Sequence, residues 1–311
     1  MQVKIGTFTG TGASLSITGV GFQPDLALVK IPTASSDTWF RTKDMPATYS
    51  LPVRADGSHG INDVVSLDSD GFTLGTDTAV NVNAVVGVYL AVRDDGKGDF
   101  STVTYTGDNT DDKLVFSGFQ PIFALLKSDS AITGSMKFAG QASALATPTS
   151  NISSMQYGGG GDRSEQIGFL GGGLYVSKGN SGNVVNVAAT AHYGFAFGSS
   201  TNKTLAFNFT GTGTAGFAPA FSSFRPGFVI LRNSTGLAPQ IQFSSEAANT
   251  TQPWDTAAVA NSITSLGSNG ITVGTLSDAN GLGNSIWGFY LYDPAFFVAG
   301  GHSLASMGVG A

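Results

Sequence analysis

Cysteine is absent from this chain of 311 residues, and charged side chains are scarce. Without cysteine the chain can form neither a disulfide nor a thiolate nucleophile, and cysteine usage says nothing about its cellular compartment. Charged residues make up only 12% of the sequence, the formal net charge is −6, and lysine and arginine do not cluster. Binding to a nucleic-acid backbone depends on clustered basic residues, so nucleic acid is not an expected partner.

Long apolar stretches are missing as well. No segment approaches the roughly 20 uninterrupted apolar residues that a membrane-spanning helix requires, so membrane insertion is not expected. The first residues, Met1 to Gly6, lack the apolar core of a secretory signal. We therefore expect a soluble chain that is made in the cytoplasm.

The patterns of metal sites and nucleophilic enzymes are not found either. None of the three histidines has a second histidine at the HxH or HExxH spacing, which favours surface positions or satisfied polar contacts. These histidines are His59, His192 and His302. There is no Gly-x-Ser-x-Gly motif, and the run from Gly158 to Gly161 lacks the lysine of a phosphate-binding loop. The sequence therefore predicts no bound metal and no cofactor.

Carboxylate pairs suited to glycoside hydrolysis are also hard to assemble. The chain has only two glutamates, Glu165 and Glu246, and they lie far apart in the sequence. Asp68 and Asp70 could form a pair, but their pattern is typical of a turn. Asp162 could pair with Glu165, but both are expected in a solvated loop. Since glycosidases need two carboxyl groups a few ångströms apart, we expect a protein that is not an enzyme, with a surface-glycan hydrolase as a minor alternative.

A short phrase that occurs three times dominates the organisation of the chain. Each copy has a phenylalanine, one spacer residue, a proline, a mostly apolar run and a basic residue six positions after the proline. The copies run from Phe22 to Lys30, from Phe119 to Lys127 and from Phe224 to Arg232. The recurring basic residue suits either a repeated structural salt bridge or a shared function.

The spacing of the phrase sets the expected domain organisation. The prolines lie about 100 residues apart, whereas solenoid repeats have periods of roughly 20 to 50 residues. This spacing predicts three modules, which we number 1 to 3, over 1–97, 98–200 and 201–298. A C-terminal arm over 299–311 follows them.

Composition and patterning favour strands throughout. Glycine is abundant at 43 residues, and valine, phenylalanine and threonine are frequent, a composition that disfavours helices and suits pleated sheets. The apolar runs after the prolines are too short for stable helices and predict strands covered on both faces. Turn-forming pairs such as Asp70-Gly71 and Asn269-Gly270 open a further strand later in the module. We predict an all-β fold of three tandem jelly-roll-like antiparallel β-sandwich modules.

The segment from Asp94 to Asp99, at the first module junction, superficially resembles a calcium-binding loop. It lacks the bidentate glutamate at the twelfth position of such a loop. Its position favours a plain linker turn, with a calcium ion as the alternative.

The modules diverge between the proline strand and the later turn, and loops that vary on a rigid frame commonly carry binding. Aromatic rings in these segments could stack on a sugar while neighbouring polar side chains hydrogen-bond its hydroxyls. The candidate carbohydrate-binding residues are Trp39, Arg41, Tyr49, Tyr157, Asp162, Trp254 and Asp255. Trp39 and Trp254 could instead cap the ends of their sandwiches or lie in a subunit interface, since aromatic residues are enriched in both roles, whereas Trp287 is expected in a core strand.

Module 1 resembles a domain that recurs in virion proteins of tailed bacteriophages and of phage-like gene transfer agents. The resemblance rests on a glycine-rich turn, a Gly-Phe-x-Pro-Asp-Leu phrase with a following basic residue, and an Asp-Gly-Phe-x-x-Gly phrase. The matching residues are Gly21, Phe22, Pro24, Asp25, Leu26, Lys30, Asp70, Gly71, Phe72 and Gly75. Modules 2 and 3 keep the phenylalanine and proline but not the aspartate. The resemblance implies a β-sandwich on the outside of a particle and carries no catalytic motif.

We therefore expect a structural and adhesive protein of a phage or gene transfer agent particle, such as a head spike or a tail fibre. It would lie on the virion surface, contact other virion proteins as an assembly subunit or homo-oligomer, and bind host-surface polysaccharide. The alternative is a capsid or tail decoration protein whose three modules form a pseudo-threefold cap.

Overall fold

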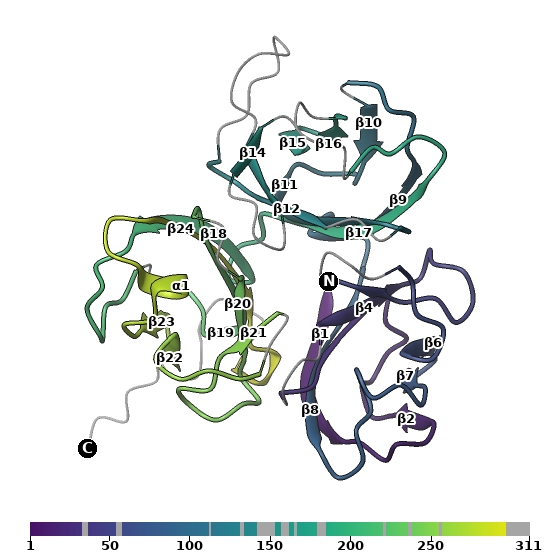
Figure 1. The fold of residues 1–311 in the computed structure, drawn as a ribbon, viewed down its shortest axis with the longest axis horizontal. Helices are drawn as coiled ribbons and strands as arrows, with labels where there is room; N and C mark the ends of the chain where they lie inside the picture. The colour runs from purple at the N-terminus through teal and green to yellow at the C-terminus, as the bar shows by residue number, and fades with distance from the viewer. Residues whose placement is uncertain are drawn as a thin grey trace.

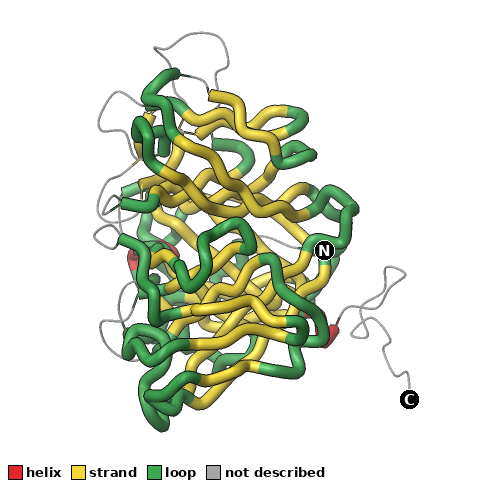
Figure 2. The backbone as a smooth tube through the Cα atoms, turned by 90° about the vertical axis from the view of Figure 1, so that its right-hand side faces the viewer, coloured by secondary structure: helices red, strands yellow, loops and turns green. Residues whose placement is uncertain are grey.

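The computed structural model describes residues 1–32, 37–53, 58–111, 113–130, 134–141, 153–156, 162–164, 167–178, 185–219, 222–235, 238–254 and 257–296. Its regular structure is almost entirely β, in antiparallel sheets, and Figure 2 shows how strands account for most of the chain. Helix among the described residues is confined to α1 (Ser277–Asn280) and η1 (Pro294–Phe296). The prediction of an all-β fold is confirmed, and the jelly-roll-like form of each module stays a prediction.

Module 1 folds as two antiparallel sheets, with the strand orders β1-β8-β3-β4-β5 and β2-β7-β6. The first sheet contains β1 (Gln2–Thr9), β8 (Val86–Arg93), β3 (Leu26–Lys30), β4 (Trp39–Thr42) and β5 (Leu51–Pro52). The second contains β2 (Leu15–Ile17), β7 (Gly71–Leu74) and β6 (Val64–Asp68).

Module 2 has the same arrangement with one more strand at the edge of its larger sheet, in the orders β14-β13-β12-β11-β17-β9 and β10-β16-β15. The larger sheet contains β9 (Phe100–Thr106), β17 (Ala191–Gly198), β11 (Pro121–Ser128), β12 (Ser135–Phe138), β13 (Ser153–Gln156) and β14 (Asp162–Ser164). The smaller contains β10 (Lys113–Phe116), β16 (Gly173–Val176) and β15 (Ile167–Leu170).

Module 3 repeats the larger sheet, in the order β18-β24-β19-β20-β21, and its smaller sheet has two named strands, β22-β23. The larger sheet contains β18 (Thr204–Thr210), β24 (Ser285–Tyr292), β19 (Pro226–Asn233), β20 (Gln240–Phe243) and β21 (Gln252–Pro253). The smaller contains β22 (Ile263–Gly267) and β23 (Gly270–Val273).

The repeated proline phrase leads into the same strand of each larger sheet. β11 begins at Pro121, β19 begins at Pro226, and β3 begins two residues after Pro24. Each of these strands lies between the strand that closes its module and the strand that follows it in the chain. Proline suits the start of a strand because it has no amide hydrogen to donate within the ladder. Every sheet draws its strands from one of the three ranges set by the repeat.

The proline strands are covered on both faces, as their unbroken apolar runs predict. All five residues of β3 are buried. Ala27 and Val29 point into the sandwich of module 1, where they join a core that contains Phe72. Leu26 and Leu28, which alternate with them, belong to a second and larger core. A strand in this position needs apolar residues on both faces, which removes the alternation expected of a half-exposed strand.

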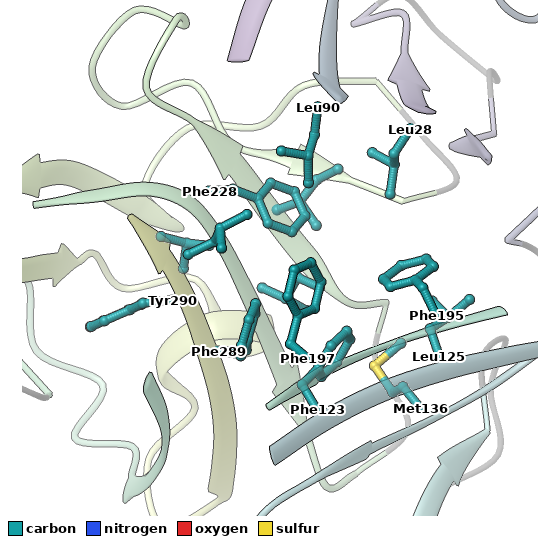
Figure 3. Close-up of a cluster of buried hydrophobic side chains, with 14 of the residues drawn as sticks. Leu28, Leu90, Phe123, Leu125, Met136, Phe195, Phe197, Phe228, Phe289 and Tyr290 are labelled. Atoms are coloured by element: carbon teal, nitrogen blue, oxygen red, sulfur yellow. The ribbon is translucent and has the colours of Figure 1, made fainter. Parts of the chain in front are cut away.

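This larger core is shared by all three modules. Figure 1 shows the modules arranged around a common centre with their larger sheets facing inward, and Figure 3 shows the side chains that meet there. Phe123 of module 2 stacks on Phe289 of module 3, and Phe197 packs against the same ring at a tilt, with ring centroids 4.9 and 5.0 Å apart. Phe40 of module 1 packs edge-on against Phe195 of module 2 at 5.9 Å. The three modules therefore pack into one body and are not separate domains joined by linkers.

Candidate functional site

Trp254 lies in the contact between modules 3 and 1. Its side chain is fully buried in the shared core. Its carbonyl oxygen accepts hydrogen bonds from the backbone nitrogen of Thr38 at 2.8 Å and from the Thr38 hydroxyl at 3.2 Å. A buried indole offers no face to a sugar ring, and the structure places Trp254 in a contact between two modules of the same chain rather than in the predicted sandwich cap or subunit interface.

Trp39 lies at the edge of module 1 and is partly buried against its core. Its ring lies next to Gly60 and near Asp63. A Cβ atom added at Gly60 would lie within 2.9 Å of both the Trp39 ring and the Asp63 carboxyl group. The Asp63 carboxyl group is only 1% exposed, and its Oδ1 accepts no hydrogen bond from the described residues. Burial, with a further contribution from the charge of Asp77, raises the pKa of Asp63 to about 7. Trp39 thus caps the sandwich beside a carboxyl group that resists ionisation.

Arg41 and Tyr49 are brought together, but in a structural link between modules 1 and 2. The buried Arg41 guanidinium donates to the carbonyl oxygen of Tyr49. The Tyr49 ring stacks on His59 with centroids 3.8 Å apart, and His59 Nδ1 lies 2.6 Å from Asp129 Oδ1 of module 2. Burial also lowers the pKa of Arg41. This chain of contacts fastens the two modules together.

The other candidate carbohydrate-binding residues add nothing to the contacts of Arg41 and Tyr49. Asp162 is part of β14, whose backbone pairs with β13. Tyr157 and Asp255, like the predicted arm over 299–311, lie outside the described residues. The predicted carbohydrate-binding residues that are described therefore do not converge on one surface.

The strand-end basic residues Lys30, Lys127 and Arg232 are all fully buried. Lys30 Nζ lies 3.5 Å from the carbonyl oxygen of Trp254 in module 3, and Lys127 Nζ donates to the carbonyl oxygen of Ser130 at 2.9 Å. These two contacts are hydrogen bonds to backbone carbonyl oxygens, so the repeated salt bridge stays a prediction.

The charge of Lys30 acts on Glu246 of module 3. Burial raises the pKa of Glu246 to about 7, although three neighbours lower it: the Phe243 amide, the Gln252 side chain and Lys30. Its carboxyl group accepts from the Phe243 amide at 2.8 Å and from Gln252 Nε2 at 2.6 Å. Glu246 is therefore engaged in local hydrogen bonds.

The segment from Asp94 to Asp99 forms a junction between modules. The Met1 amino group lies 2.6 Å from a carboxylate oxygen of Asp95 and 2.6 Å from one of Asp99. Asp99 also accepts from the Ser200 hydroxyl at 3.2 Å and lies 3.6 Å from Lys203 Nζ. The two carboxylates thus face cationic groups of the protein itself, as expected of a linker turn. Across the described residues, no group of three or more potential metal ligands is found.

A pocket of about 370 Å³ opens between modules 1 and 3. It is lined by Lys4 and Ile5 of β1, and by Arg225, Ser244, Ser245 and 293–296 of module 3. Arg225 Nε lies 3.4 Å from Asp293 Oδ2, and the guanidinium carbon lies 4.1 Å from the centroid of the Phe296 ring. The Ser245 hydroxyl donates to the carbonyl oxygen of Gly6 at 3.4 Å, which joins the two walls.

Sequence reasoning missed this pocket. Its two walls come from segments more than 200 residues apart in the chain, and Arg225 is the spacer residue of the repeated phrase in module 3. The one signal in the sequence is that this spacer is arginine in module 3 and glutamine, as Gln23 and Gln120, in the other two copies.

Comparisons with known proteins give no match to a family model, to a curated protein or to a solved structure. In the part of the chain that the structure describes, no helix has the length and hydropathy needed to cross a membrane.

Proposed function

We propose that this chain is a structural protein on the surface of a phage or gene transfer agent particle, where it acts as a single-chain equivalent of a trimer. The observation that carries the proposal is the shared core, in which equivalent strands of three repeated modules pack around one centre. The type of particle comes from the resemblance of module 1 to virion proteins.

Three similar modules around one axis suit an assembly role. In a ring of identical subunits, one head-to-tail interface is repeated until the ring closes. Here the three interfaces are formed within one chain, so each module is free to diverge while the ring stays closed. The protein can therefore present three similar but unequal faces to other virion proteins, as a decoration protein or the base of a spike does.

The placement of the candidate residues supports this role. Trp254 contacts Thr38 of module 1, and Arg41 and Tyr49 lead to His59, whose Nδ1 lies 2.6 Å from Asp129 of module 2. These aromatic and charged side chains therefore support the pseudo-trimer. An assembly subunit requires such contacts and requires no reaction centre.

The test is to locate the protein on intact particles and to delete its gene. We expect labelled antibody or cryo-electron microscopy to place it on the particle exterior, with density for three lobes around a local axis. Deletion should lower the temperature or salt stress at which the particles lose their contents. Absence of the protein from purified particles would overturn the proposal.

Attachment to host-surface polysaccharide is a second candidate function. The pocket between modules 1 and 3 favours it, since an aromatic ring, a guanidinium group and two hydroxyls meet there. If this candidate is right, deletion of the gene lowers adsorption to encapsulated cells more than it lowers particle stability.

A further inference from the structure

The pocket between modules 1 and 3 has a counterpart in module 2. That counterpart, of about 460 Å³, is lined by Gln120, Pro121, Ile122, Phe138, Ala139, Gly140, Gln141, Phe169 and Ser199. By the repeat, Gln120 stands where module 3 has Arg225. Ser199 follows β17 as Asp293 follows β24, so it stands where module 3 has Asp293. The same frame is thus uncharged in module 2 and charged in module 3.

The charged groups of the module 3 pocket leave a net positive charge. Arg225 is partly exposed and has Asp293 beside its Nε, while its two terminal nitrogens form no hydrogen bond to the described residues. Lys4 lines the same pocket and forms no ion pair within the described part of the chain. Two cations face one carboxylate, so the pocket can accept one further negative charge.

The remaining walls suit a sugar rather than a small inorganic ion. Ligand pockets for small organic molecules have volumes of about 300–1,000 Å³, and this one falls in that range. Phe296 is 38% exposed and supplies an apolar ring, while Ser244 and Ser245 supply hydroxyls. The Ala295 amide donates a hydrogen bond to Asp293 Oδ1 at 3.0 Å and fixes this carboxylate. The carboxylate can also accept a hydrogen bond from a sugar hydroxyl.

We propose that this pocket binds a uronic acid residue of an acidic polysaccharide, with the sugar carboxylate at the Arg225 terminal nitrogens and Lys4. Arginine binds a carboxylate through two parallel hydrogen bonds, which neither glutamine nor serine in the module 2 pocket can reproduce. The inference rests on the second candidate function and names its ligand class. The structural role on a particle does not depend on it.

The experiment is calorimetric titration of the full chain with trigalacturonic acid, and separately with its methyl ester, at low salt. The ester keeps the sugar rings and removes the charge. We expect the acid to bind at least tenfold more tightly than the ester. Arg225→Gln, which copies the module 2 residue, should weaken binding of the acid about tenfold, since a hydrogen bond to a charged group contributes enough for that change.

The control is Gln120→Ala, at the equivalent position of the uncharged pocket, which should leave binding unchanged. Arg225→Lys should recover only part of the affinity because it keeps the charge but loses the planar pair of donors. Near-ultraviolet circular dichroism and the melting temperature of each variant establish that it is folded.

Three results would overturn the inference: no binding of the acid at millimolar concentration, equal binding of acid and ester, or an unchanged affinity in Arg225→Gln. Equal binding of acid and ester would leave attachment to polysaccharide standing and remove the acidic specificity. Absence of all binding to trigalacturonate, together with adsorption that still depends on the gene, would place attachment elsewhere on the molecule.

Discussion

Phe123 and Phe289 stack across the boundary between modules 2 and 3, with ring centroids 4.9 Å apart and ring planes inclined by 21°. Both rings are fully buried, although their strands are separated by more than 150 residues of chain. Both residues belong to the shared core that Figure 3 displays. Stability of the whole chain therefore depends on contacts that no module makes alone.

Phe289→Ala should destabilise the protein by about 3–5 kcal/mol, because the truncation opens a cavity where two modules meet. The measurement is the free energy of unfolding in urea. Phe116→Ala is the matched control: this ring is 76% exposed on β10, so its removal should change stability by less than about 0.5 kcal/mol. An equal effect of the two substitutions would contradict a shared core.

The ring stack that holds His59 beside Asp129 of module 2 can be tested by a double-mutant cycle on Tyr49 and His59. Their rings stack at 3.8 Å with planes inclined by 8°. We expect a coupling free energy of about 0.5–1.5 kcal/mol between Tyr49→Ala and His59→Ala. Pairing Tyr49→Ala with Leu282→Ala, an exposed residue of module 3, should instead give additive effects. A zero coupling for the stacked pair would show that the contact is not formed in solution.

Asp63→Asn should stabilise the protein at pH 8 more than at pH 5. The folded-state pKa of Asp63 is raised to about 7 by burial and then by Asp77, whereas an unfolded aspartate titrates near 3.9. The folded state therefore keeps a proton that the unfolded state loses, and this contribution to stability disappears as pH rises from about 4 to 7. Asparagine avoids the buried charge, so we expect a gain of roughly 2 to 4 kcal/mol at pH 8, about 1 kcal/mol at pH 5 and little change near pH 3.

Asp70→Asn provides the control with the opposite sign. The backbone amides of Gly21 and Gly19 donate to the Asp70 carboxylate at 2.6 and 3.0 Å and lower its pKa. The stabilisation that the ionised Asp70 carboxylate gives the folded state is present above the pKa of the unfolded state. It is lost as the pH falls through the pKa of the folded state. The substitution should therefore be destabilising at pH 8 and nearly silent at pH 2. Urea unfolding at each pH measures both variants, and a gain for both at pH 8 would count against these assignments.

Gly71→Ala should be strongly destabilising. Gly71 has φ of +148°, and a Cβ there would lie 1.9 Å from the carbonyl oxygen of Ile17 on the neighbouring strand. Backbone strain and the clash together should cost roughly 2 to 5 kcal/mol. Gly96→Ala, with φ of +76° and no atom within 4 Å, should cost only about 1–2 kcal/mol. Thermal unfolding of the two variants compares them directly, and equal losses would refute the close approach at Gly71.

Much of the fold could be predicted from the sequence because the relevant signals are local. The run from Leu26 to Val29 has no polar alternation, and an apolar run of that length indicates a strand covered on both faces. The Asp70-Gly71 pair indicates a turn because glycine tolerates the backbone conformation found there. The threefold repetition of both signals indicates three equivalent modules.

The candidate site was harder to predict because it depends on neighbours distant in sequence. A tryptophan beside polar residues has the same pattern whether it stacks on a sugar or fills an interface, and only the approach of Thr38 and the shared core decides the matter for Trp254. The pocket that contains Arg225 needs Lys4 on its other wall, and no local pattern connects the two.

The sequence by itself determined the class of fold, the number of modules and the strands that each module places at its centre, since periodicity and turn chemistry are properties of neighbouring residues. Only the tertiary structure decided what covers the second face of those strands. Three apolar sheet faces avoid water by packing against one another, and this closure buries Trp254, joins Phe123 to Phe289 and opens a charged pocket between the first and the last module.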